Sequence, residues 1–161
     1  TTLAQPGGCL RNAASGVVDL YRVTFTNCRS GAGGAIANAG AVRGVEVTFA
    51  ANMGPPGDED WANGGAILND GPGSSLDFRR AAFTGNRGAN GGAIHTTGSF
   101  FTPPRAAIHI EDSSFTDNHA VQIGGAVLAT IVVAVALSGG WPAAIAVVGI
   151  WVLALAILVS T

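Results

Sequence analysis

Charged side chains gather at three places in the sequence: Asp58-Glu59-Asp60, Asp77 with Arg79-Arg80, and Glu111-Asp112. Clustered carboxylates, or an arginine beside an acid, are the residue types that general acid–base catalysis uses. Neighbouring residues in a strand point to opposite faces, so Glu111-Asp112 and Arg79-Arg80 would each diverge. The acidic trio stands in an irregular stretch with no rigid element to position it. The sequence therefore predicts no catalytic site, and we expect that the chain is not an enzyme.

Cysteine and histidine do not indicate a metal site. Cys9 and Cys28 are too few for structural zinc, and His95, His109 and His119 have no ligand spacing with them. The two cysteines form either a disulfide, which suits an oxidising compartment, or two buried thiols. No metal or cofactor is expected, and the sequence does not say whether lipids or pigments contact its apolar end.

Charge is scarce and unevenly placed in this chain of 161 residues. Charged residues make up 11% and hydrophobic residues 48%, against about 25% charged in an ordinary soluble domain. The net charge of −2 gives no basic field for phosphates, so no nucleic-acid partner is expected. Because no catalytic site is predicted, no small-molecule substrate is expected either. Residues 120–161 carry no charge. A soluble domain does not leave so much apolar surface uncovered, which predicts a charge-bearing part followed by an apolar tail.

Two short motifs recur in the charge-bearing part at intervals of about 30 residues. Gly-Gly-Ala followed by Ile or Val begins at Gly33, Gly64, Gly91 and Gly124. Phe-x-x-Asn begins at Phe49, Phe83 and Phe115, and an irregular version, with Cys28 in the asparagine position, begins at Phe25. Alternating apolar and polar residues precede the phenylalanines, as in Val45–Thr48, Leu76–Arg79 and Ile108–Glu111, and predict strands.

Such a repeat predicts an all-β solenoid of about four coils, because one coil cannot bury its apolar side chains alone. The core is expected to hold an aromatic and an aliphatic ladder: Phe25, Phe49, Phe83 and Phe115, and Ile36, Ile67, Ile94 and Val127. Bends are expected at the paired glycines and at asparagines that bond backbone groups: Gly64, Gly65, Gly91, Gly92, Gly124, Gly125, Asn52, Asn86 and Asn118.

This motif pair, Gly-Gly-Ala-Ile/Val with Phe-x-x-Asn, resembles the repeats of the polymorphic outer membrane protein family over roughly residues 16–127. The resemblance implies a short right-handed parallel β-helix. It also implies a role as a cell-surface adhesion module. Because right-handed β-helices include polysaccharide lyases, a lyase-like enzyme is a further alternative.

Two insertions interrupt the regular coil, at residues 53–61 and 99–105. Insertions in a solenoid project as loops and often form its contact face. The residues expected to contact a partner are Asp58, Glu59, Asp60, Trp61, Phe100 and Phe101. The alternative is a solvated loop whose aromatic side chain folds back onto the coil.

The tail predicts a single transmembrane helix over residues 142–161, after a repeat domain at 1–130 and a cap or linker at 131–141. Residues 142–159 are apolar and span about 27 Å as a helix, close to the hydrocarbon thickness of a bilayer. Its notable residues are Trp141 at the interface, Pro142 at the first turn, Ala146, Gly149, Trp151 and Ala156. Two alternatives are a helical hairpin that also uses residues 121–137, and an anchor signal that is later removed.

Taken together, the sequence predicts a non-catalytic, single-pass membrane protein. We expect a small accessory subunit that covers the lumenal or extracellular face of a larger membrane complex, with a photosynthetic or respiratory assembly as one that fits. Its N-terminal domain is expected in an extracytoplasmic compartment, either a thylakoid lumen or a bacterial exterior. The N-terminus, which begins Thr1-Thr2-Leu3-Ala4, is expected to result from removal of a leader.

Overall fold

The computed structural model describes residues 7–97 and 106–129. Regular structure in these ranges consists of short strands and one turn of 3-10 helix, η1 (Glu59–Trp61). All strand pairings are parallel. None of the helical structure in the described ranges is long enough, or apolar enough, to cross a membrane.

The strands form three sheets and one further pair. The first sheet has the order β1 (Leu10–Asn12), β4 (Ile36–Asn38), β7 (Ile67–Asp70), β11 (Ile94–Thr97) and β15 (Val127–Ala129). The second has the order β12 (Ala107–Glu111), β8 (Ser75–Arg79), β5 (Ala41–Val45) and β2 (Val17–Tyr21). The third has the order β13 (Ser114–Thr116), β9 (Ala82–Thr84), β6 (Thr48–Ala50) and β3 (Thr24–Thr26). The pair consists of β10 (Arg87–Asn90) and β14 (His119–Ile123).

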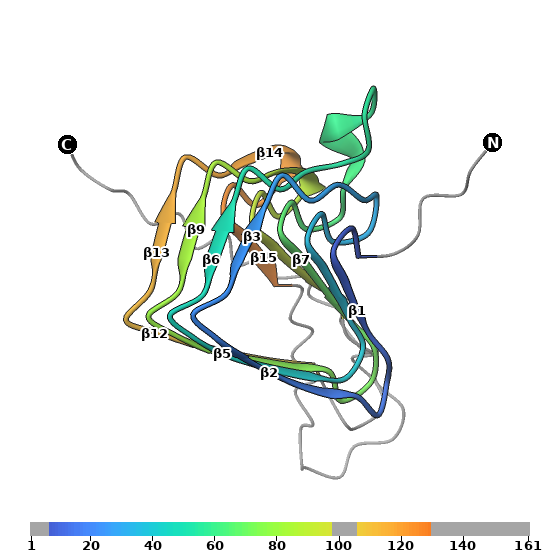
Figure 1. Ribbon diagram of the computed structural model, residues 1–161. Coiled ribbons are helices and arrows are strands. Elements are labelled where there is room, and N and C mark those ends of the chain that lie inside the picture. Colours follow the sequence, from blue (N-terminus) through green and yellow to red (C-terminus); the bar gives the residue numbers. More distant parts are fainter. Residues whose placement is uncertain (1–6, 98–105, 130–161) are drawn as a thin grey trace, which may run out of the picture.

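Successive coils of the chain add one strand to each sheet, which gives a β-solenoid (Figure 1). Equivalent residues of the repeat stand directly above one another, as Phe49 does opposite Phe83. The prediction of an all-β chain of stacked parallel strands is confirmed. The cap or linker and the transmembrane helix expected over residues 131–161 lie outside the described residues. Strands β14 and β15 occupy residues 119–123 and 127–129, so the alternative in which a membrane helix includes residues 121–129 is wrong.

The phenylalanines form one continuous stack in the core. The ring centroids of Phe25, Phe49, Phe83 and Phe115 follow one another at 5.2, 4.8 and 4.6 Å, and stacked rings are parallel to within 6°. Phe78 meets Phe49 and Phe83 edge-on. Aromatic pairs contribute about 0.5–1.5 kcal/mol each beyond their buried area. The aliphatic ladder packs in the same core, with its first three members fully buried: Ile36, Ile67, Ile94 and Val127.

The two glycines of each doublet serve different purposes. The first has a positive φ, as at Gly64 with 73°, a conformation that glycine adopts without strain. The second allows neighbouring coils to approach, because a Cβ on Gly65 would lie 2.0 Å from the carbonyl oxygen of Gly92. Gly125, in the last described doublet, meets nothing within 4 Å among the described residues.

Asparagines of the Phe-x-x-Asn motif form a buried ladder beside the bends. The Asn52 Nδ2 donates to the Asn86 Oδ1 (2.9 Å), and the Asn86 Nδ2 donates to the Asn118 Oδ1 (2.8 Å). Each Nδ2 also donates to the carbonyl of a phenylalanine in the coil before, such as Asn86 to Phe49 at 3.0 Å. The ladder begins at Cys28, whose backbone N–H donates to the Asn52 Oδ1 (3.0 Å). These side chains therefore join adjacent coils as well as bonding backbone groups.

Two features of the fold differ from the sequence prediction. Residues 45–48 do not form one strand: β5 ends at Val45, Glu46 has a φ of 57°, and β6 begins at Thr48, because the coil turns there between sheets. A second polar ladder runs along the first sheet, through Asn12, Asn38, Asn69 and Thr96, with donor–acceptor distances of 2.8, 2.7 and 2.9 Å.

Candidate interaction surface

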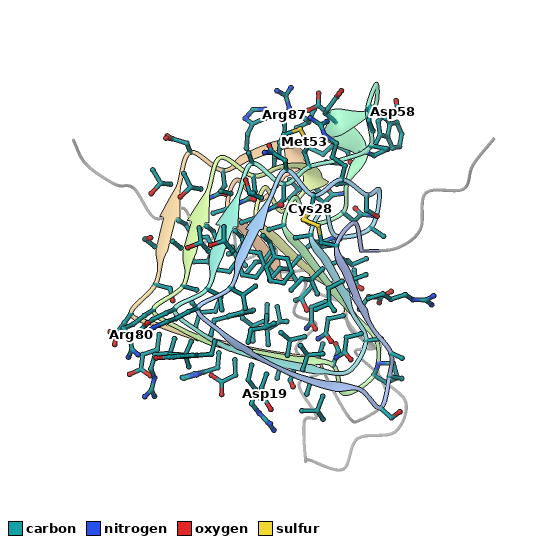
Figure 2. The ribbon with its side chains drawn as sticks, in the orientation of Figure 1. Asp19, Cys28, Met53, Asp58, Arg80 and Arg87 are labelled. Carbon is teal, nitrogen blue, oxygen red and sulfur yellow. A yellow bond between two sulfur atoms is a disulfide. The ribbon has the colours of Figure 1, made fainter. Side chains whose placement is uncertain are left out.

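The insertion after Asn52 folds into a compact projection on one corner of the solenoid. The backbone N–H of Gly54 donates to the carbonyl of Glu59, and that of Trp61 donates to the carbonyl of Asp58, both at 3.0 Å. Figure 2 shows Asp58 on this projection, beyond the body of the solenoid. The acidic trio thus has a defined conformation, although the sequence offered no rigid element for it.

Ion pairs fasten the insertion to two neighbouring coils. Asp60 receives two hydrogen bonds from the guanidinium of Arg87, one from Nε and one from Nη2 at 3.0 Å. The Arg29 Nη1 lies 3.5 Å from the Glu59 Oε1, which also accepts the backbone N–H of Gly57 at 3.1 Å. The Arg87 hydrogen bonds lower the pKa of Asp60, and the Gly57 N–H lowers the pKa of Glu59. Both carboxylates therefore remain ionised at neutral pH.

Trp61 is the most exposed large apolar side chain among the described residues, at 68%. Because it ends η1, the ion pairs of Glu59 and Asp60 hold its backbone in place. The alternative in which this aromatic folds back onto the coil is wrong, since it presents most of its surface to solvent. An indole held on a fixed turn loses little conformational freedom when a partner covers it.

Exposed apolar residues also stand on β14, which pairs with the strand that carries Arg87. Arg87, the partner of Asp60, stands opposite His119 in the pairing of β10 with β14. Farther along β14, Val121 is 51% and Ile123 is 48% exposed. We call the surface formed by Asp60, Trp61, Arg87, His119, Val121 and Ile123 the insertion surface. It combines apolar side chains with one fixed ion pair.

The other candidate catalytic residues are engaged separately along the second sheet. Asp77 lies 3.2 Å from the Nδ1 of His109, Arg79 pairs with Glu111 at 2.7 Å, and Arg80 pairs with Glu46 at 3.0 Å. Glu46 also pairs with Arg22. The hydrogen bond from Arg22 lowers the pKa of the Glu46 carboxyl most, and the hydrogen bond from Arg80 lowers it further.

These pairs stack along the solenoid rather than converge on a point. Figure 2 shows Arg80 at one corner of the solenoid and Asp19 on the outer face of the second sheet. Asp112 stands at the same corner position as Arg80 in the next coil, with a φ of 49°.

His95 is buried, unlike the exposed charged side chains described above. It is 8% exposed, and its Nδ1 has no hydrogen-bond partner in the part of the chain that the structure describes. Burial lowers its pKa, against a smaller opposite effect of Asp70. Asp70 also contributes to a shallow hollow whose lining includes Arg11, Ala37 and Leu68. No group of three His, Cys, Asp or Glu side chains within residues 7–97 and 106–129 is arranged to hold a metal.

Several predicted site residues lie elsewhere. Cys9 and Cys28 are joined by a disulfide with a Cα–Cα distance of 5.7 Å, which links the N-terminal segment to the start of the asparagine ladder. Phe100 and Phe101, and the membrane residues Trp141, Pro142, Ala146, Gly149, Trp151 and Ala156, lie outside the described residues. Arg87 and β14 are parts of the insertion surface that sequence reasoning missed. The signals available in the sequence were the position of Arg87 directly after Asn86 and the alternation of residue types along β14.

Comparison with known proteins found no matching family model, curated protein or solved structure.

Proposed function

We propose that this protein is a non-catalytic accessory subunit of a membrane complex, which binds a neighbouring subunit through the insertion surface. The observation that carries the proposal is Trp61, exposed at 68% on a turn that ion pairs hold to two coils. Tryptophan is enriched among the residues that dominate the binding energy of protein interfaces. The carboxylates and arginines of the other clusters stand in separate pairs along the coils, an arrangement suited to a rigid column.

The β-solenoid and the apolar tail together suggest how the protein is placed relative to the membrane. A right-handed β-helix of about four coils would stand on the lumenal or extracellular side, with residues 142–161 as a transmembrane helix. The disulfide between Cys9 and Cys28 suits an oxidising compartment on that side. A thylakoid lumen and a bacterial exterior both meet this requirement. No metal, cofactor, nucleic acid or small-molecule substrate enters the proposal.

Native electrophoresis of membranes solubilised in mild detergent tests the proposal. The wild-type chain should comigrate with a complex much larger than 16.0 kDa. Trp61→Ala should release it to low mass, whereas the control Tyr21→Ala should not. Tyr21 is 61% exposed, comparable to the 68% of Trp61, but it lies on β2, at the opposite end of the solenoid from β14. Free migration of the wild-type chain would refute the subunit proposal.

A second candidate is a cell-surface adhesion module of the polymorphic outer membrane protein type. The support for this candidate is that both motifs recur in successive coils. The Phe-x-x-Asn residues form the aromatic core and the asparagine ladder, and the Gly-Gly-Ala residues lie where neighbouring coils touch. An adhesion module would migrate alone after solubilisation. Purified protein would then bind cells or matrix through the same exposed tryptophan, and Trp61→Ala would reduce that binding.

A further inference from the structure

The turn η1 in the insertion distributes its side chains over three directions. A 3-10 helix has three residues per turn, so side chains three positions apart share one side. Glu59 and Asp60 take two of these directions, and each reaches an arginine of a neighbouring coil. The third direction belongs to Asp58 and Trp61, which are three positions apart. A hydrogen bond of 3.0 Å from the Trp61 N–H to the Asp58 carbonyl joins them across the turn.

The carboxylate of Asp58 differs from its two acidic neighbours in having no partner among the described residues. It makes no hydrogen bond to the turn that follows it, and it takes part in none of the ion pairs of residues 7–97 and 106–129. Figure 2 shows Asp58 on the projection, beyond the body of the solenoid. The outward side of the turn therefore carries one uncompensated negative charge.

The indole of Trp61 accompanies this charge, and its surface is 68% exposed. In the part of the chain that the structure describes, the one guanidinium that lies over an aromatic ring is that of Arg22, over Tyr21, so none covers Trp61. A cation is attracted to the face of an aromatic ring, and tryptophan binds it best. A carboxylate and an indole on one side of a turn are therefore two groups that a single guanidinium can engage together.

The chain already contains one example of this combination. The guanidinium carbon of Arg22 lies 4.8 Å from the centroid of the exposed Tyr21 ring, and the Arg22 Nε donates to the Glu46 Oε2 at 2.7 Å. One arginine thus lies over an exposed aromatic ring while it pairs with a carboxylate. Asp58 and Trp61 offer the same two groups, and no arginine of the described residues engages them.

We propose that Asp58 and Trp61 bind an arginine side chain of the neighbouring subunit. The guanidinium lies over the indole and pairs with the Asp58 carboxylate, while the ion pairs of Glu59 and Asp60 keep the turn in place. A lysine fits this site less well, because its ammonium group is not planar and cannot pair with a carboxylate through two parallel hydrogen bonds. The inference rests on the proposed function, since it specifies what the partner presents to the insertion.

Fluorine NMR of the full chain in detergent, labelled with fluorotryptophan, tests the site directly. The chain has three tryptophans, and the Trp61 resonance is the one that Trp61→Phe removes. Nα-acetylarginine amide should shift this resonance, whereas its uncharged analogue Nα-acetylcitrulline amide should not. Asp58→Asn should weaken the arginine binding about fivefold, and the control Asp112→Asn, at another exposed aspartate, should leave it unchanged. No shift specific to arginine, or equal binding by Asp58→Asn and wild type, overturns the site.

Native electrophoresis separates this inference from the subunit proposal. Asp58→Arg should release the chain from the complex, because it places two guanidinium groups together, whereas Asp112→Arg should not. Release by Trp61→Ala but not by Asp58→Arg would overturn the arginine site and leave the subunit proposal standing. Free migration of the wild-type chain would refute the subunit proposal, whatever the fluorine spectra show.

Discussion

Replacing Gly65 by alanine should separate two coils of the solenoid. The new Cβ would lie 2.0 Å from the Gly92 carbonyl oxygen and 2.7 Å from the Arg87 backbone nitrogen, both of which are main-chain atoms. An ordinary contact needs 3.4 Å or more, so the coils must move apart locally. The hydrogen bonds that join them here run from Gly65 to Gly91, and from Ala66 and Ile67 to Ala93, at 2.8–3.0 Å.

The magnitude follows from these contacts. Overpacking alone costs about 1–3 kcal/mol, and each weakened hydrogen bond about 1 kcal/mol more. We therefore expect Gly65→Ala to lower the free energy of unfolding by about 3–5 kcal/mol. Gly125→Ala is the matched control from another doublet, and it should change stability by no more than about 0.5 kcal/mol because no atom of the described residues lies within 4 Å of the new Cβ.

Urea unfolding of the full chain in one detergent, followed by far-ultraviolet circular dichroism, measures both variants. Gly65→Ala should lower the urea midpoint and Gly125→Ala should leave it close to that of the wild-type chain, while all three share the same spectrum in the folded state. A loss below about 1 kcal/mol for Gly65→Ala, or an equal loss for Gly125→Ala, would refute the assignment of the second glycine to coil contact.

Three further predictions concern the ladders, the corners and the buried histidine. Asn86→Ala should lower the free energy of unfolding by about 3 kcal/mol, because it leaves several buried backbone and amide groups unpaired. Asn118→Ala, at the half-buried end of the asparagine ladder, should lower it less, and urea unfolding of both variants checks which loss is larger. Ala51 has a φ of 53° and Gly85 a φ of 60° at equivalent corners, so Ala51→Gly should stabilise and Gly85→Ala destabilise by about 0.5–1 kcal/mol each, seen as opposite shifts of the urea midpoint. Burial lowers the pKa of His95 from its ordinary 6.5, so the unfolded chain binds the proton more readily and stability should fall as pH drops below that value. His95→Gln should flatten the dependence of the urea midpoint on pH between about 7 and 5, and an unchanged slope would show that other groups cause it.

The recurring motifs were enough to predict the stacked strands and the composition of the core. Phe49 and Phe83 occupy equivalent places because each must cover the ring of the coil before, so their spacing follows from the repeat itself. Phe78 was not predicted to join them. It fills the space that Gly44 leaves in the neighbouring coil, where a Cβ would come within 2.4 Å of its ring. A compensating pair of this kind spans two coils and breaks the repeat, so periodicity does not reveal it.

Contacts between coils of unequal length could not be predicted from the sequence either. The pairing of Asp60 with Arg87 depends on how the insertion folds, which the repeat does not determine. The ladder through Asn12, Asn38 and Asn69 was missed because it ends in Thr96, and because turns of different length follow its members.

The distance between the outer faces of the first and fourth coils tests the stacking most directly. Asp19, Arg43, Asp77 and His109 stand in register on successive strands of the second sheet. Spin labels at Asp19→Cys and His109→Cys would leave the native disulfide intact and report the separation by electron paramagnetic resonance. Three inter-strand steps of about 4.8 Å predict a backbone separation of about 14 Å. A narrow distribution near that value is the expected result, and a separation beyond about 25 Å would contradict the stacked coils.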